Sequence, residues 1–219
     1  MTDPSDPSAP TGAARPGEVP AAPAALLRAE ALRWHWPGTP LIDGVSITVG
    51  PGVALVRGGD GRGKTTLLRL LAGTLAPQAG RVEAFAPVWL ADAGAPEDDG
   101  VGAGDWLERA RIARAPWDAT LAADLVEAFA LGPHLDKALF RLSTGSRRKL
   151  ALVAAFAGGT PVVLLDAPFA ALDGPSRAVL GELLAAAVDH RRRAWIVADH
   201  ECPRWLEGRR LAGEVDLGE

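Results

Sequence analysis

The chain has 219 residues and a mildly acidic balance, with 23 Lys and Arg against 27 Asp and Glu and a formal net charge of −4. A module that binds duplex nucleic acid needs a basic surface to neutralise phosphates, so this balance argues against a nucleic-acid partner. The apolar fraction of 48% is enough for a globular core, and a single cysteine, Cys202, excludes an internal disulfide framework and a Cys-rich zinc module.

The amino-terminal segment, residues 1–24, is rich in Pro, Ala and Gly and lacks hydrophobic periodicity, which predicts a disordered leader. Its first residues carry acids where a signal peptide needs a basic patch. The longest weakly charged stretch, residues 150–165, is interrupted by Gly158-Gly159-Thr160-Pro161 and falls short of the ~20 apolar residues of a membrane span. We therefore expect residues 25–219 to form one cytoplasmic domain that works at the inner face of a membrane only through another polypeptide.

Strand patterns come first along this domain. Alternating residues at 32–36 and 45–49, separated by Pro37-Gly38, predict two antiparallel strands, and the apolar run 53–56 predicts a strand buried on both faces. A glycine-rich turn and a helix over 64–72 follow. These segments indicate an amino-terminal antiparallel β subdomain that leads into a buried sheet.

Residues 93–145 have a different character, with a polar Gly-rich loop and helical patterns over 105–113 and 117–130, which predict a small helical subdomain. An alternation of helices and strands then resumes. Its predicted elements are a helix over 147–156, a strand over 161–165, a helix over 175–190 and a strand over 194–198. Such alternation predicts an α/β fold with a mainly parallel sheet and helices on both faces.

The strongest chemical signal is a glycine-rich run between the buried strand and the next helix. It matches G-x-x-x-x-G-K-[ST] and reads Gly58-Gly59-Asp60-Gly61-Arg62-Gly63-Lys64-Thr65-Thr66. Glycines let backbone N–H groups wrap around phosphates, and the helix N-terminus adds positive potential. In this motif the Lys reaches the β- and γ-phosphates and the Thr hydroxyl ligates Mg²⁺. The run predicts a triphosphate site of the P-loop type.

Two further segments accompany this loop. The strand 162–165 ends in Asp166, and because ligands of a parallel sheet sit at the carboxyl ends of its strands, Asp166 is expected to face the phosphates and serve the metal. Taken alone this signal is weak. Ser143, in Leu142-Ser143-Thr144-Gly145-Ser146, is a natural N-cap for the helix that follows.

Together these segments resemble the ATP-binding cassette (ABC) ATPases. Residues 142–146 resemble the L-S-G-G-Q signature of that family, residues 165–173 resemble its L-D-E-P-x-x-x-L-D block, and the strand before His200 resembles the one that ends in its switch histidine. Trp36 falls where the family carries an aromatic that stacks on adenine. The resemblance covers residues 26 to 215, and the motifs occur in the family's order.

The resemblance implies a role for each matching position. Residues 58–66 would bind ATP with Trp36 stacked on the base, Asp166 would serve Mg²⁺, and His200 would touch the γ-phosphate. Ser143 and Gly145 would contact the γ-phosphate of a nucleotide held by a second ABC subunit, in a homo- or heterodimer, with Asp173 at the seam. The helical subdomain would contact an integral membrane subunit.

Three departures from the family pattern bear on activity. The family's catalytic glutamate is Ala167 here, and loss of a general base typically costs about 10²–10⁴-fold in rate. The glutamine that senses Mg²⁺ aligns with Asp92, which could still ligate the cation. The signature carries Thr144 and Ser146 in place of a glycine and the glutamine. We therefore expect binding to survive and hydrolysis at this chain's own site to be slow.

The leading hypothesis is an ATP-binding subunit of an ABC-type transporter with attenuated hydrolysis. Two alternatives stay open: a soluble ABC protein that acts as an ATP-gated switch outside transport, and a P-loop kinase. The basic runs 147–149 and 191–193 are interpreted as solvated surface, the second one as complementing the dipole of the helix before it.

Overall fold

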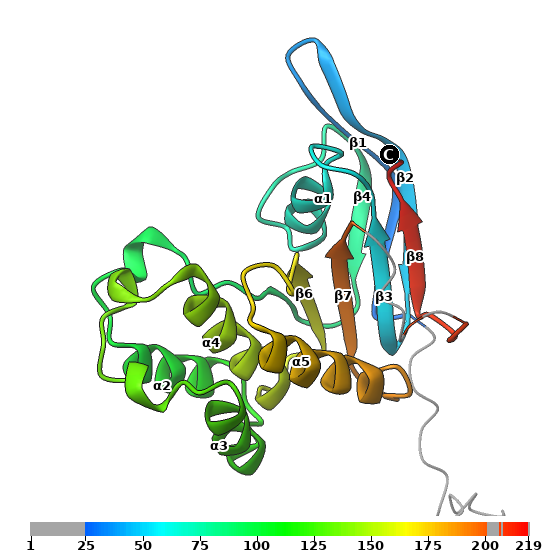
Figure 1. The fold of residues 1–219 in the computed structure, drawn as a ribbon. Helices are drawn as coiled ribbons and strands as arrows, with labels where there is room; N and C mark the ends of the chain where they lie inside the picture. The colour runs from blue at the N-terminus through cyan, green and yellow to red at the C-terminus, as the bar shows by residue number, and fades with distance from the viewer. Residues whose placement is uncertain (1–24, 201–205, 207, 219) are drawn as a thin grey trace, which may run out of the picture.

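The computed structural model describes residues 25–200, 206 and 208–218. The predicted leader, residues 1–24, lies outside the described residues, as does Cys202. Figure 1 shows a sheet domain with a group of helices to one side. In chain order the elements are β1 (Leu27–Trp36), β2 (Thr39–Val49), β3 (Gly52–Arg57), α1 (Lys64–Leu71), β4 (Ala79–Ala84), β5 (Val88–Leu90), α2 (Ala103–Ala113), α3 (Ala119–Ala128), α4 (Thr144–Ala157), β6 (Val162–Asp166), α5 (Gly174–Ala187), β7 (Ala194–Asp199) and β8 (Gly213–Asp216).

The centre of the molecule is a five-stranded parallel sheet with the strand order β5-β6-β7-β3-β8. Its three inner strands are continuous apolar runs because both of their faces are covered. Successive side chains of a strand point to opposite faces, so Val53 and Leu55 pack in one hydrophobic cluster while Ala54 and Val56 pack in the other.

Two different layers cover the faces of this sheet. One face packs against α1 and a three-stranded antiparallel sheet of order β2-β1-β4, and the other packs against α4 and α5. The predicted α/β fold with an antiparallel β subdomain is therefore confirmed. Strands β4, β5 and β8 were not predicted, because they carry little buried apolar surface of their own.

The helical part is formed by α2 and α3, which contact α4, together with short 3₁₀ turns at 96–98, 132–134 and 139–141. Helix α3 begins at Ala119 instead of residue 117, because the Asp118 carboxylate caps it by accepting the Leu121 N–H at 2.9 Å. Within the part of the chain that the structure describes, no helix combines the length and apolarity of a membrane span.

The interpretation of residues 191–193 as a solvated turn is wrong for Arg193. Its guanidinium donates to the carbonyls of Ala155, Phe156 and Thr160 at 2.7, 3.1 and 3.0 Å, and it stacks on Trp195 with its Cζ atom 4.5 Å from the ring centroid. Arg193 thus stabilises the carboxyl end of α4, a helix distant in sequence, and not the end of the helix that precedes it.

Candidate functional site

The phosphate loop, residues 58–63, connects the end of β3 to the start of α1. Gly61 and Gly63 take φ values of 74° and 95°, a left-handed conformation that glycine adopts without strain. A Cβ on Gly63 would lie 2.9 Å from Ile42 Cδ1 and 3.0 Å from Leu41 Cγ of the neighbouring strand β2. The positive φ and this close approach to β2 therefore favour glycine at the last position of the loop, just before the first helical turn of α1.

The side chain of Lys64 is buried at the centre of this loop, where it is 9% exposed. Its Nζ donates to the carbonyls of Gly58 and Gly59 at 2.6 and 2.8 Å. The ammonium group and the amino end of α1 therefore put positive charge at the same point, which suits a polyphosphate.

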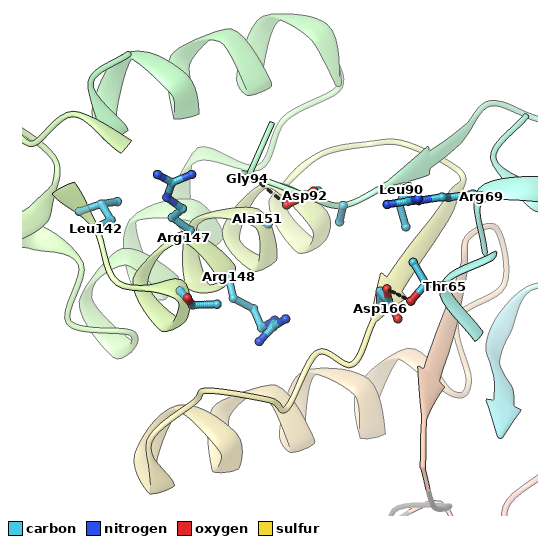
Figure 2. Close-up of a pocket in the computed structure, with 12 residues that line it drawn as sticks. Thr65, Arg69, Leu90, Asp92, Gly94, Leu142, Arg147, Arg148, Ala151 and Asp166 are labelled. Carbon is cyan, nitrogen blue, oxygen red and sulfur yellow. Dashed lines mark hydrogen bonds between the residues drawn. The ribbon is translucent and has the colours of Figure 1, made fainter. Parts of the chain in front are cut away.

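Thr65 on α1 and Asp166 at the end of β6 meet beside this loop. The Thr65 Oγ1 hydroxyl donates to Asp166 Oδ2 at 2.7 Å, although the two residues are 101 positions apart in sequence. Figure 2 shows this pair pointing toward one another at the edge of a cavity. A hydroxyl and a carboxylate so arranged are oxygen ligands of the kind that Mg²⁺ takes together with phosphate oxygens and water.

The residue after Asp166 contributes no functional group. Ala167 has a φ of 42° and donates its N–H to the Ala198 carbonyl at 2.8 Å, so its backbone is tied to β7 while its side chain is a methyl group. It opens a turn, residues 167–173, which we call the Ala167 turn. No atom of the Ala167 side chain can accept a proton from water.

The signature segment, residues 142–146, contains the predicted N-cap of α4, and the helix begins at Thr144, three residues before its predicted start. Ser143 is the N-cap, and its Oγ accepts the Ser146 N–H at 3.1 Å. A Cβ on Gly145 would collide with the Ala171 carbonyl of the Ala167 turn. The signature segment and the Ala167 turn are therefore packed together within one chain.

The interpretation of residues 147–149 as a solvated face is wrong. Arg147 forms an ion pair with Asp99 at 2.8 Å, Arg148 donates to the Ala170 carbonyl, and Lys149 Nζ lies 2.6 Å from Asp173 Oδ2. The hydrogen bond from Lys149, followed by those from Ser176, lowers the pKa of the Asp173 carboxyl well below its ordinary range. These cations fasten α4 to the Ala167 turn and to the loop before α2, a role that their spacing in sequence does not reveal.

Three other predicted residues, His200, Asp92 and Trp36, form no hydrogen bond with Thr65 or Asp166 among the described residues. His200 Nε2 lies 3.3 Å from Asp60 Oδ1 in the phosphate loop. Asp92 accepts the Gly94 N–H at 2.7 Å and lines the same cavity as Thr65 and Asp166. Trp36 is 59% exposed near the tip of the β1–β2 hairpin, edge-on to Trp34.

The cavity that Thr65 and Asp166 border has a volume of about 440 Å³ and extends from them to the signature segment and the first turns of α4. Thr65 and Asp166 line it on the sheet side, and Arg147 and Arg148 of α4 line it on the other (Figure 2). Asp92 and Thr144 also line it. Among the residues that the structure describes, no three His, Cys, Asp or Glu side chains are grouped to hold a metal by themselves. The donors present fit a cation shared with phosphates and do not form a self-contained metal cage.

Comparisons with known proteins agree with this geometry. Residues 42–170 match the profile of a family described as ABC transporter. The chain is 36% identical over 165 residues to the cytochrome c biogenesis ATP-binding export protein CcmA of Ruegeria pomeroyi, covering 74% of this chain and 79% of that protein. It is 34% identical over 175 residues to the taurine import ATP-binding protein TauB of Pseudomonas fluorescens, covering 73% of this chain and 66% of that protein.

Comparison with solved structures points to the same kind of protein. A solved ATP-binding subunit of an ABC transporter superposes with a TM-score of 0.66 at 19% identity, covering 80% of this chain and 79% of the other. That likeness supports the architecture alone. Because the family profile spans more than half of the chain and the CcmA relative aligns over most of its own length, the chain belongs to the family of ABC transporter ATP-binding proteins.

Proposed function

We propose that this chain is the ATP-binding subunit of an ABC-type transporter that binds Mg-ATP, dimerises and acts on a separate membrane subunit, with slow hydrolysis at its own site. The family membership supports the general role. The proposed place of work is the cytoplasmic face of the membrane, reached through that membrane subunit.

Binding of the triphosphate is assigned to residues 58–66. The backbone N–H groups of the loop and the Lys64 ammonium would hold the phosphates, the Thr65 hydroxyl and the Asp166 carboxylate would hold Mg²⁺, and Trp36 would offer its exposed ring to the base. When bound, the cation neutralises phosphate charge and polarises the phosphoryl group. The hydrogen bond from Thr65 to Asp166 and the fit of Gly63 against β2 support this assignment.

Slow hydrolysis rests on one observation, the methyl group of Ala167 at the end of β6. An attacking water must lose a proton, and a side chain without an acceptor cannot take it. Asp166 is already engaged with Thr65, and in the proposed complex it serves the cation. The expected deficit relative to a site with a glutamate is about 10²–10⁴-fold.

In the proposed dimer, the second subunit would complete each nucleotide site. Ser143 and Gly145 would contact the nucleotide of the second subunit, and a partner with an intact glutamate would hydrolyse ATP at the other site. The names of the relatives, one an export protein and one an import protein, favour transport over a free-standing switch and leave its direction open. Copurification of a membrane protein with the chain tests the transport role.

The test of the proposed site compares the wild-type chain with Ala167→Glu and Lys64→Ala. The wild type is expected to bind Mg-ATP and hydrolyse it slowly, Ala167→Glu to gain at least about 100-fold in hydrolysis, and Lys64→Ala to lose binding. Brisk turnover by the wild type, with no gain in Ala167→Glu, would contradict attenuation. Absence of nucleotide binding by the folded wild type would contradict the whole assignment.

A further inference from the structure

A second cavity, of about 740 Å³, lies at the end of the sheet opposite the phosphate loop. The loop follows the carboxyl ends of the parallel strands, whereas this cavity includes Trp195, near the amino end of β7. Its other walls come from the start of α3, the end of α4 and the second half of α5. A volume of this size suits a small organic molecule.

The walls of this cavity are mainly apolar and aromatic. Phe156 of α4 and Trp195 of β7 stack with ring centroids 5.6 Å apart and an interplanar angle of 14°. Trp117, Leu121 and Leu183 contribute further apolar surface. Phe156 and Trp195 are only 6% and 3% exposed and Arg193 stacks on Trp195, so the surface open to a ligand comes mainly from the half-buried Trp117, Leu121 and Leu183. These side chains favour an apolar ligand body over a polar one.

The guanidinium of Arg193 lines this cavity and forms no ion pair with a carboxylate of the described residues. Arg193 uses three of its five N–H donors on the carbonyls of Ala155, Phe156 and Thr160. Burial lowers the pKa of Arg193 to about 10, so the group is still charged at neutral pH. A partly buried charge of this kind is stabilised by an anion.

Two other polar side chains that line the cavity have hydrogen bonds of their own. The Asp118 carboxylate caps α3, and His190 Nδ1 accepts the backbone N–H groups of Arg192 and Arg193 at 3.1 and 3.0 Å. The indole N–H of Trp195, whose side chain is buried, has no acceptor among the described residues. Arg193, which keeps two further N–H donors, is therefore the cation of this cavity that an anion can contact.

We propose that this cavity binds a small planar aromatic carboxylate, with its ring against the half-buried surface of Trp117, Leu121 and Leu183 and its carboxylate on the Arg193 guanidinium. The proposal does not depend on nucleotide binding. A charge-assisted hydrogen bond to Arg193 supplies selectivity for the anion, because a neutral analogue of the same shape leaves the cation without a partner.

The experiment uses 1-naphthoate as the probe and 1-naphthamide as its neutral isostere. Binding is measured by calorimetry and by the NMR shift of the Trp195 indole N–H, assigned with Trp195→Phe. We expect 1-naphthoate to bind, the amide to bind about tenfold to a hundredfold more weakly, and Arg193→Gln to remove that preference. Arg191→Gln, which removes an exposed neighbouring arginine, is the matched control and should change nothing.

A second variant covers the case in which Arg193→Gln loses the stabilised end of α4 and unfolds. Ala186→Trp fills the mouth of the cavity while leaving Arg193 and Trp195 in place, and it should abolish binding. Lys64→Ala should bind 1-naphthoate as the wild type does, which separates this site from the proposed nucleotide site. Equal binding of acid and amide, unchanged binding in Ala186→Trp, or no binding at millimolar probe would each overturn the proposal.

Discussion

The phosphate loop and the Ala167 turn face the same proposed ligand but reach their left-handed backbone conformations in different ways. The loop uses glycine at Gly61 and Gly63, whereas the turn uses alanine at Ala167 and Ala171, with φ values of 42° and 58°. A left-handed alanine costs roughly 1–2 kcal/mol. The loop is thus free of this strain, and the turn is held in place by its neighbours.

Those neighbours are identifiable. Arg148 donates to the Ala170 carbonyl, Arg177 donates to the Phe169 carbonyl at 2.8 Å, and Ala167 is bonded to β7. The backbone conformation of the phosphate loop therefore follows from its local sequence. The backbone conformation of the Ala167 turn, by contrast, depends on contacts from α4 and α5.

The largest expected effect concerns the loop alone. Lys64→Ala removes the ammonium that stands at the centre of the loop, and we expect Mg-ATP to bind at least about 100-fold more weakly because charge-assisted contacts to phosphate are lost. Equilibrium binding measured by calorimetry tests this. Wild-type affinity in a folded Lys64→Ala variant would show that this side chain does not bind the phosphates.

The packing of the signature segment on the Ala167 turn gives the next effect. Gly145→Ala places a methyl group against the Ala171 carbonyl, which is main chain and cannot swing away, so we expect a loss of about 1–3 kcal/mol in the free energy of unfolding. Gly174→Ala, with no heavy atom within 4 Å of its new Cβ, is the matched control and should stay within about 0.5 kcal/mol. Urea unfolding of both variants decides the point.

A reciprocal pair tests the backbone strain directly. Gly61→Ala meets no atom within 4 Å but must hold a φ of 74°, so it should destabilise the chain by about 1 kcal/mol. Ala171→Gly relieves a strained residue and should stabilise it by about 0.5 kcal/mol after the entropy cost of glycine. Changes of the same sign in thermal unfolding would contradict the strain argument.

The smallest effect is electrostatic and appears only in acid. The folded-state pKa of Asp173 lies below its ordinary value of 3.8, so this carboxylate stabilises the fold above that value, and the contribution is lost as pH falls through the folded-state pKa. Lys149→Met should raise the pKa of Asp173 and flatten the acid dependence of stability. The pKa of Asp173 is followed by NMR titration. An unchanged pKa in Lys149→Met would show that Lys149 does not lower it.

Much of the molecule follows from the sequence by itself. The apolar runs of β3, β6 and β7 specify a buried parallel sheet because only strands covered on both faces tolerate continuous hydrophobicity. The glycine spacing of residues 58–63 specifies a loop that must precede a helix, and Ser143 specifies the start of α4, because these are local backbone requirements.

Other features depend on contacts between residues that are distant in sequence. Strands β4, β5 and β8 carry too little apolar pattern to be predicted and exist because neighbouring strands pair with them. Arg148, Lys149 and Arg193 look like surface charges in sequence, yet each bonds to a segment more than 20 residues away. Local patterns encode backbone conformation and burial, whereas the partner of a long charged side chain is fixed only when the chain folds and brings distant carbonyls and carboxylates within its reach.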